Sequence, residues 1–92
     1  MKLQQLRYVL EVYRQGLNVS AAAETLFTSQ PGVSKQIRLL EVELGVEVFV
    51  RSGKRVTGVT QPGRIILEIA ERILRDAENL KQAGQEFSNE AV

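Results

Sequence analysis

The sequence predicts a mainly α-helical fold, in which four helices accompany one small β-hairpin. Apolar residues recur at spacings of three and four in four segments of the 92-residue chain, as they do on the buried face of a helix. Glycines and polar capping residues separate these segments. Before the last segment, a β-branched and aromatic stretch leads into a Ser-Gly-Lys turn, which is typical of a hairpin.

The first two helices are predicted to be short. The apolar face of the first consists of Leu3, Leu6, Leu10, Tyr13 and Leu17. Gly16 is expected to end this helix, and Asn18 suits an N-cap for an Ala-rich second helix over residues 19–27. The buried face of the second helix is expected to consist of Ala22, Ala23 and Leu26. The two alanines there would let a neighbouring helix approach closely.

A third helix is predicted from Ser29 to about Leu44, with Gly45 as its stop. Either Thr28 or Ser29 could cap it, and Ser29 is preferred because Pro31 then falls in the first turn, where its missing N–H has no helical partner. Its apolar stripe consists of Val33, Ile37, Leu40 and Leu44. The opposite face, expected to meet solvent, carries Pro31, Ser34, Lys35, Arg38 and Glu41.

A small hairpin with a basic tip is predicted next. Residues 46–51 fit a strand, residues 52–54 a turn and residues 55–59 the return strand. Thr60 then suits the N-cap of a last helix that reaches about Phe87. Along this helix, spacings of four and three form a heptad seam of Ile66, Ala70, Ile73, Ala77, Leu80, Gly84 and Phe87. Ile65 and Ile69 widen its apolar face near the start.

Composition excludes several kinds of chemistry. The chain contains no cysteine and no histidine, which removes disulfides, thiolate nucleophiles and the commonest general base and zinc ligand. The glycines form no phosphate-binding loop. We therefore expect no enzyme activity, no cofactor and no metal. No apolar run reaches transmembrane length and the start lacks a signal-peptide pattern, so a soluble cytoplasmic protein without membrane contact is expected.

The arrangement of short helices points to DNA. Two short helices joined by a tight turn, lying on a first helix and followed by a hairpin, form a winged helix-turn-helix, whose second helix enters the major groove. Residues 1–60 carry eight Lys/Arg and five Asp/Glu, a balance that favours phosphate. Side chains suited to base edges or phosphates begin this helix, namely Ser29, Gln30, Ser34, Lys35 and Arg38. The hairpin tip adds Arg51, Ser52, Lys54 and Arg55. Which residues read bases and which contact phosphates stays open.

The long last helix has two possible roles. It could fold back within one chain, or it could pair with a second copy, and the heptad seam favours pairing. The expected dimerisation residues are Ile66, Ile69, Ala70, Ile73, Ala77 and Leu80. A symmetric homodimer would bind double-stranded DNA with dyad symmetry. The alternative is a winged helix that binds another protein, whose affinity would depend less on salt than that of a DNA-binding module.

Several motifs resemble one family closely. They are Ala22-Ala23-Glu24-x-Leu26, Ser29-Gln30-Pro31-x-Val33-Ser34-Lys35-Gln36-Ile37, Leu40-Glu41-x-Glu43-Leu44-Gly45, Phe49-x-Arg51 and Val59-Thr60-x-x-Gly63. In order and spacing they are similar to the LysR-type transcriptional regulators, from residue 3 to about 75. The runs Leu17-Asn18-Val19-Ser20, Thr28-Ser29-Gln30-Pro31-Gly32 and Arg51-Ser52-Gly53-Lys54 are similar to its CysB/Cbl subgroup, which controls sulfur assimilation.

The resemblance implies a winged helix-turn-helix over residues 1–60 and a dimerising linker helix over 61–88, with 89–92 as a frayed tail. It adds Pro31 to the major-groove residues and extends the wing contacts to Thr57. Family members are usually about three times longer, assemble as tetramers and bind a small-molecule effector through a C-terminal domain. That domain is absent here, so the chain is expected to be a fragment that binds no inducer.

Overall fold

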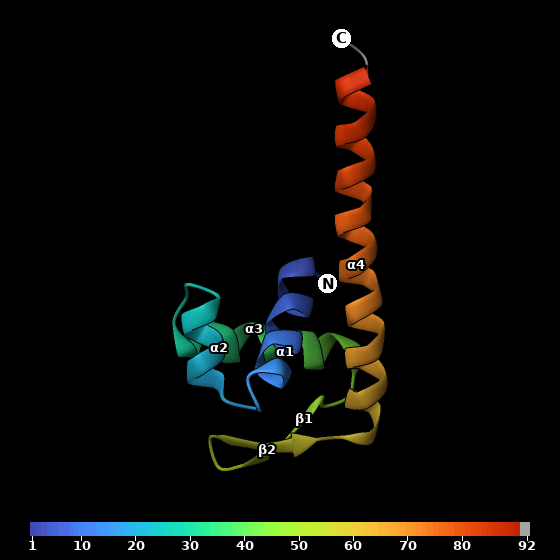
Figure 1. Ribbon diagram of the computed structural model, residues 1–92. Coiled ribbons are helices and arrows are strands. Elements are labelled where there is room, and N and C mark those ends of the chain that lie inside the picture. Colours follow the sequence, from blue (N-terminus) through green and yellow to red (C-terminus); the bar gives the residue numbers. More distant parts are fainter. Residues whose placement is uncertain (91–92) are drawn as a thin grey trace.

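The computed structural model describes residues 1–90 as a winged head from which one long helix projects (Figure 1). The elements follow in the order α1 (Leu3–Arg14), α2 (Val19–Thr25), α3 (Gln30–Leu44), β1 (Phe49–Ser52), β2 (Arg55–Val59) and α4 (Gln61–Glu90). The strands β1 and β2 form a two-stranded antiparallel sheet, which is the wing. The predicted fold class, a mainly helical winged helix-turn-helix with a long last helix, is confirmed.

Local capping signals set most helix boundaries. The Asn18 side chain accepts a hydrogen bond from Ala21 N at 2.9 Å, and Ser29 Oγ accepts one from Gly32 N at 3.1 Å, so both predicted N-caps are confirmed. Gly45 ends α3 in the left-handed conformation at φ 76°. The helix α2 ends at Thr25, two residues before the predicted end, because Phe27 adopts a left-handed conformation at φ 55° that a helix cannot continue through.

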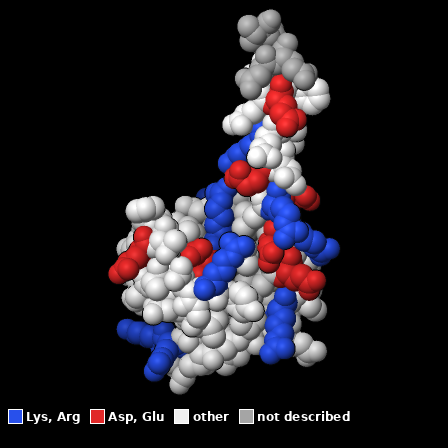
Figure 2. All heavy atoms as spheres, in the orientation of Figure 1, with Lys and Arg blue, Asp and Glu red and all other residues white. Residues whose placement is uncertain are grey.

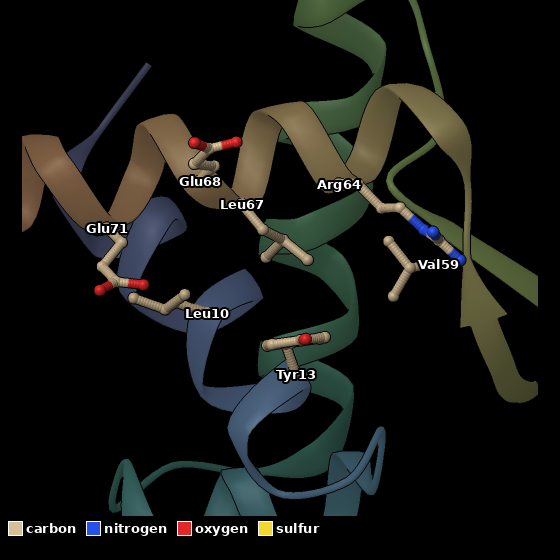
Figure 3. A pocket seen from close by; sticks show the side chains of 7 residues that line it. All are labelled: Leu10, Tyr13, Val59, Arg64, Leu67, Glu68 and Glu71. Atoms are coloured by element: carbon tan, nitrogen blue, oxygen red, sulfur yellow. The ribbon is translucent and has the colours of Figure 1, made fainter.

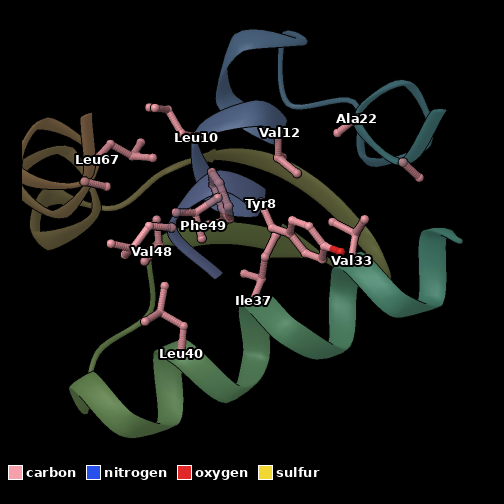
Figure 4. Packing of buried hydrophobic residues seen from close by; sticks show 14 residues of the cluster. Tyr8, Leu10, Val12, Ala22, Val33, Ile37, Leu40, Val48, Phe49 and Leu67 are labelled. Carbon is pink, nitrogen blue, oxygen red and sulfur yellow. The ribbon is translucent and has the colours of Figure 1, made fainter. Parts of the chain in front are cut away.

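The core lies where α1, α3, the start of the wing and α4 meet (Figure 4). Its fully buried side chains include Val9, Val12, Val33, Leu40, Val48 and Phe49. The predicted apolar face of α1 was partly wrong, since Leu3 and Tyr13 are 42% and 52% exposed and Leu17 lies beyond the helix. The reason is that α1 contacts α2, α3 and α4 together, so it buries a wider surface that includes Val9 and Val12.

The wing begins later than predicted. The strand β1 starts at Phe49 rather than at residue 46, because residues 45–48 form a loop that leads off the end of α3. Leu44, expected in the buried stripe of α3, is 38% exposed beside this loop. The pairing register shifts between Val50 and Arg51, where Thr57 is the extra residue on β2.

The helix α4 starts against the head and then leaves it. Gly63 N donates to Thr60 Oγ1 at 2.9 Å, as expected of the predicted cap. A Cβ on Gly63 would overlap the carbonyl of Val48, so glycine lets the first turn lie directly on the start of β1. The helix continues to Glu90, beyond the predicted end near Phe87 and into the expected frayed tail. Residues 91 and 92 of that tail lie outside the described residues.

Candidate nucleic-acid interface

The N-terminal end of α3 presents the predicted reading face to solvent. Ser29, Gln30, Pro31, Ser34 and Lys35 are all exposed, while the buried stripe of Val33, Ile37 and Leu40 anchors the helix from the other side. This division follows from helical periodicity, because residues three and four apart share a face. Ser29 also caps the helix, so its hydroxyl oxygen is engaged by Gly32 N–H.

The wing lies beside this end of α3. Between them runs a groove of about 500 Å³, whose lining includes Gln30, Pro31, Ser34, Lys35 and Arg38 from α3 and Arg51, Lys54 and Val56 from the wing. A second hollow of about 330 Å³ continues toward α2, where Ser20, Gln30, Lys54 and Arg55 contribute. The fold therefore brings together residues that lie more than twenty positions apart in the sequence. Ser52 and Thr57 are exposed on the wing but line neither hollow.

Charge is distributed unevenly over this surface. Figure 2 shows basic side chains gathered at the outer end of the wing, whereas both signs of charge alternate along α4. Within residues 1–88, Lys35, Lys54 and Arg55 take part in no ion pair. These three cations are therefore available to an anionic partner such as phosphate.

Glu41 corrects one prediction about α3. It was expected on the solvent face, but its residue is only 3% exposed. One of its oxygens, Oε2, accepts hydrogen bonds from Val48 N at 2.7 Å and Phe49 N at 3.4 Å. Arg51 donates to both carboxylate oxygens, at 2.8 Å and 3.2 Å. The loop after α3 folds over this position, so a carboxylate that the helix alone would expose becomes a clamp between α3 and the wing.

The ionisation of Glu41 reflects this environment. Burial opposes the charged form and would raise the pKa of this carboxyl. The hydrogen bonds from Arg51 and Val48, together with the positive charge of Arg51, outweigh burial and hold the pKa below its usual value of 4.5. Glu41 is therefore a carboxylate at neutral pH, and it leaves the Arg51 side chain only 20% exposed. Arg51 is engaged inside the head, unlike the other predicted wing cations.

Arg38 is intermediate between the three available cations and the half-buried, paired Arg51, because it is exposed but paired with acidic neighbours. Its guanidinium is exposed and donates to Glu47 Oε1 at 3.0 Å and to Glu41 Oε1 at 3.5 Å. The hydrogen bond from Glu47 and the charge of Glu41 raise the pKa of Arg38 above its usual range. Arg38 thus lines the groove with its charge partly balanced by two acidic neighbours.

The predicted dimerisation residues of α4 divide into two groups. Ala70 is 1% exposed and packs in the core of its own chain, so the prediction that it faces a partner was wrong. Ile66, Ile73 and Ala77 are half-buried, while Ile69 and Leu80 are 40% and 76% exposed. The reason is that α1 covers one side of the first half of α4. The side that stays open carries Ile69 and Leu80.

Another hollow lies between α1 and α4, away from the wing tip. It measures about 480 Å³, and Leu10 and Tyr13 of α1 face Leu67 of α4 across it, with Glu68 and Glu71 beside them (Figure 3). None of the predicted site residues lines it. Among residues 1–88, no group of three or more acidic side chains is placed to hold a metal ion. None of the described helices has the length and apolar character needed to span a bilayer.

Comparison with known proteins identifies the family. Residues 3–64 match the family described as "Bacterial regulatory helix-turn-helix protein, lysR family". The chain belongs to the LysR family. This match spans all of the reading helix and the wing. The motifs quoted from the sequence therefore identified the family correctly.

Similar proteins from this family include two regulators of Burkholderia cenocepacia. The chain is 56% identical over 88 residues to the HTH-type transcriptional regulator CysB, with 96% of this chain and 28% of the relative covered. It is 51% identical over 90 residues to the HTH-type transcriptional regulator SsuR, with 98% and 29% covered. The predicted likeness to the CysB/Cbl subgroup is confirmed. The chain spans less than a third of the length of these relatives.

Solved structures agree with the fold. A structure titled "Crystal structure of CbnR_DBD-DNA complex" superimposes with a TM-score of 0.86 at 35% identity, covering 96% of this chain and 99% of that one. The matched structure is thus almost the same length as this chain and includes a helix-turn-helix, a wing and a long helix in the same arrangement.

Proposed function

We propose that this LysR-family domain binds double-stranded DNA in a sequence-specific manner, with the N-terminal end of α3 in the major groove and the wing on the backbone or in the minor groove. One observation carries this proposal. The exposed reading end of α3 flanks two adjoining hollows on one side of the head, together with Lys54 and Arg55, which form no ion pair in the described part of the chain. The similarity to a domain whose structure is described as a DNA complex supports it.

The contacts can be ranked by their surroundings. Gln30, Ser34 and Lys35 are exposed on α3 and suit base edges, because they offer donors and acceptors at the major-groove side. Lys54 and Arg55 suit phosphates. Arg51 acts through Glu41 instead, by holding the wing against α3. This ranking departs from the sequence-based set, which gave Arg51 a DNA contact.

Selection of duplexes from a random library tests the proposal. Enrichment of an inverted repeat whose arms lie one or more helical turns apart would support specific binding by a dimer. Affinity for the enriched duplex should fall steeply with salt, with a log–log slope of about −0.9 for each phosphate contact. Binding to every duplex alike would refute sequence specificity for this domain. Salt-insensitive capture of a protein, without DNA binding, would favour the interaction-module alternative.

Dimerisation is proposed through the open side of α4. Ile69 and Leu80 lie there exposed, and the half-buried Ile73 lies between them. Pairing with a second copy would remove this apolar surface from water. The twofold axis of such a dimer would match the dyad of the operator. Leu80 is the best test position, because Ile73 also packs against the head and its substitution would disturb folding.

The matched pair Leu80→Asp and Asn79→Asp tests this interface. Both variants add one negative charge to neighbouring exposed positions, but only the first places it in the apolar stripe. Sedimentation over a range of concentrations should show dissociation of Leu80→Asp and an intact dimer for Asn79→Asp. An unchanged dimer in both variants would mean that another surface pairs.

For the whole protein, the relatives suggest a wider role. We propose a cytoplasmic regulator of sulfur-assimilation genes that assembles as a tetramer and senses a small molecule through a C-terminal domain. The names of the CysB, SsuR and Cbl relatives support this, and so does their length, more than three times the span matched here. A deletion strain and the same strain with the gene restored can be grown with sulfate or with an organic sulfur source. Comparing their transcript levels would test this proposal. Unchanged sulfur-gene transcripts would refute it.

A further inference from the structure

Ser20, the second residue of α2, makes the hydrogen bond that holds Gln30 at the start of α3. Ser20 Oγ donates to Gln30 Oε1 at 2.9 Å. Both side chains are exposed, and both line the hollow that leads to Lys54 and Arg55 of the wing. Both partners are exposed and this is a single hydrogen bond, so its loss should leave the fold intact. Its main effect is to restrict the orientation of the Gln30 amide.

That restriction matters for base recognition. A glutamine amide offers two N–H donors at Nε2 and an acceptor oxygen at Oε1. Adenine is recognised by both ends of the amide together, because its N7 accepts a hydrogen bond and its N6 donates one. Guanine presents two acceptors, N7 and O6, and therefore needs only donors. The hydrogen-bonding end that Gln30 is free to offer thus decides which base it prefers.

We propose that Ser20 is a positioning residue that sets the base preference of Gln30. The inference rests on the proposed DNA-binding function. Because this bond turns Oε1 toward α2, the Nε2 donors of Gln30 meet the major-groove edge, and guanine is favoured over adenine at the facing position. Without the Ser20 hydroxyl, the Gln30 amide rotates freely about its terminal side-chain torsion. It can then form hydrogen bonds with either guanine or adenine. A residue of α2, outside the reading helix, then controls specificity at one position.

The selection experiment on the full 92-residue chain tests this with four variants beside the unmodified protein. Gln30→Ala identifies the facing position, as the one where base preference is lost. There, the unmodified protein should prefer guanine to adenine roughly tenfold, a typical discrimination for a good base contact. Ser20→Ala should lower that preference by about two- to tenfold, the size of one hydrogen bond. Ser20→Thr should restore it, because threonine keeps the hydroxyl.

Thr25→Ala is the matched control. It also removes an exposed hydroxyl from α2, but that hydroxyl donates to Ala21 O and contacts Gln15 rather than Gln30. Thr25→Ala should leave the preference at the facing position unchanged. Equal thermal unfolding midpoints for Ser20→Ala and the unmodified protein would show that folding is not the cause of any change in preference.

Three outcomes overturn the inference. Unchanged preference in Ser20→Ala would mean that the hydrogen bond does not control Gln30. A preference for adenine in the unmodified protein would mean that Oε1 is free to read a base. If the unmodified protein enriches no sequence at all, the proposed function fails and this inference fails with it, a result distinct from the other two.

Discussion

The two ends of α3 differ in how firmly the rest of the protein holds them. At the C-terminal end, buried Glu41 accepts hydrogen bonds from Val48, Phe49 and Arg51, which fix the helix to the start of the wing. At the N-terminal end, Lys35 is exposed without an ion pair in the described chain, and Gln30 is held by one hydrogen bond from Ser20.

This contrast assigns separate tasks to the two ends. A helix that reads DNA must keep its angle to the wing, and the clamp of Glu41 and Arg51 supplies that rigidity. It must also offer side chains whose hydrogen-bonding groups are still free, and the other end supplies those. Substitutions at the C-terminal end should therefore affect mainly folding, and those at the N-terminal end mainly DNA binding.

The largest effect is expected for Glu41→Ala. Removing this carboxylate leaves the N–H groups of Val48 and Phe49 and the guanidinium of Arg51 without their partner in a buried place. We expect a loss of about 3–5 kcal/mol in the free energy of unfolding, the usual cost of removing one partner of a buried ion pair. Urea denaturation measures it. Glu47→Ala is the control, since its pair with Arg38 is exposed and should contribute little.

The pH dependence of stability sharpens the same point. The pKa of Glu41 is lowered in the folded protein, so its stabilising contribution is complete above 4.5 and is lost as the pH falls through the lower folded value. Glu41→Gln lacks this titration. The difference in unfolding free energy between the two proteins should be constant near neutral pH and shrink below pH 4.5. A difference that persists unchanged into strong acid would mean that the Glu41 charge plays no part.

The sequence predicts one end of α3 better than the other. Its caps and exposed reading face depend on neighbouring residues, so Ser29, Lys35 and Gly45 could be placed from local rules. The burial of Glu41 could not be predicted in this way, because it depends on the loop of residues 45–48 folding back over the helix.

Two other predictions from the sequence were wrong for the same reason, which is that burial depends on residues far away in the chain. Arg51 and Lys54 both belong to the basic tip in the sequence, and only the long-range partner Glu41 distinguishes the engaged cation from the free one. Ala70 and Leu80 belong to one heptad seam, yet only the first half of α4 meets α1. Periodicity reveals an apolar side of a helix but does not tell which element covers it.

Lys35→Ala tests the N-terminal end of α3, which is proposed to contact DNA. Because Lys35 is exposed and unpaired within the described chain, its removal should change the unfolding free energy by less than about 0.5 kcal/mol. Affinity for the selected duplex should fall. If Lys35 contacts phosphate, the salt slope should decrease in magnitude by about 1, and if it reads guanine, preference should relax at one position. Fluorescence anisotropy at several salt concentrations distinguishes these cases, and unchanged affinity with unchanged preference would contradict this placement of α3.

The smallest effect is expected for Glu47→Gln, in the loop that follows α3. Glu47 holds Arg38, a groove-lining cation, at 3.0 Å and brings a negative charge beside the proposed DNA site. Neutralising it should tighten DNA binding by about two- to fivefold at low salt, and screening should reduce the gain at high salt. Glu43→Gln, which removes the same charge from a residue that pairs with the N-terminal ammonium of Met1 and not with a groove-lining cation, should change affinity less. Weaker binding by Glu47→Gln would instead mean that Glu47 orients Arg38 for its DNA contact, which would extend the firmly held part of α3 by one turn toward its reading end.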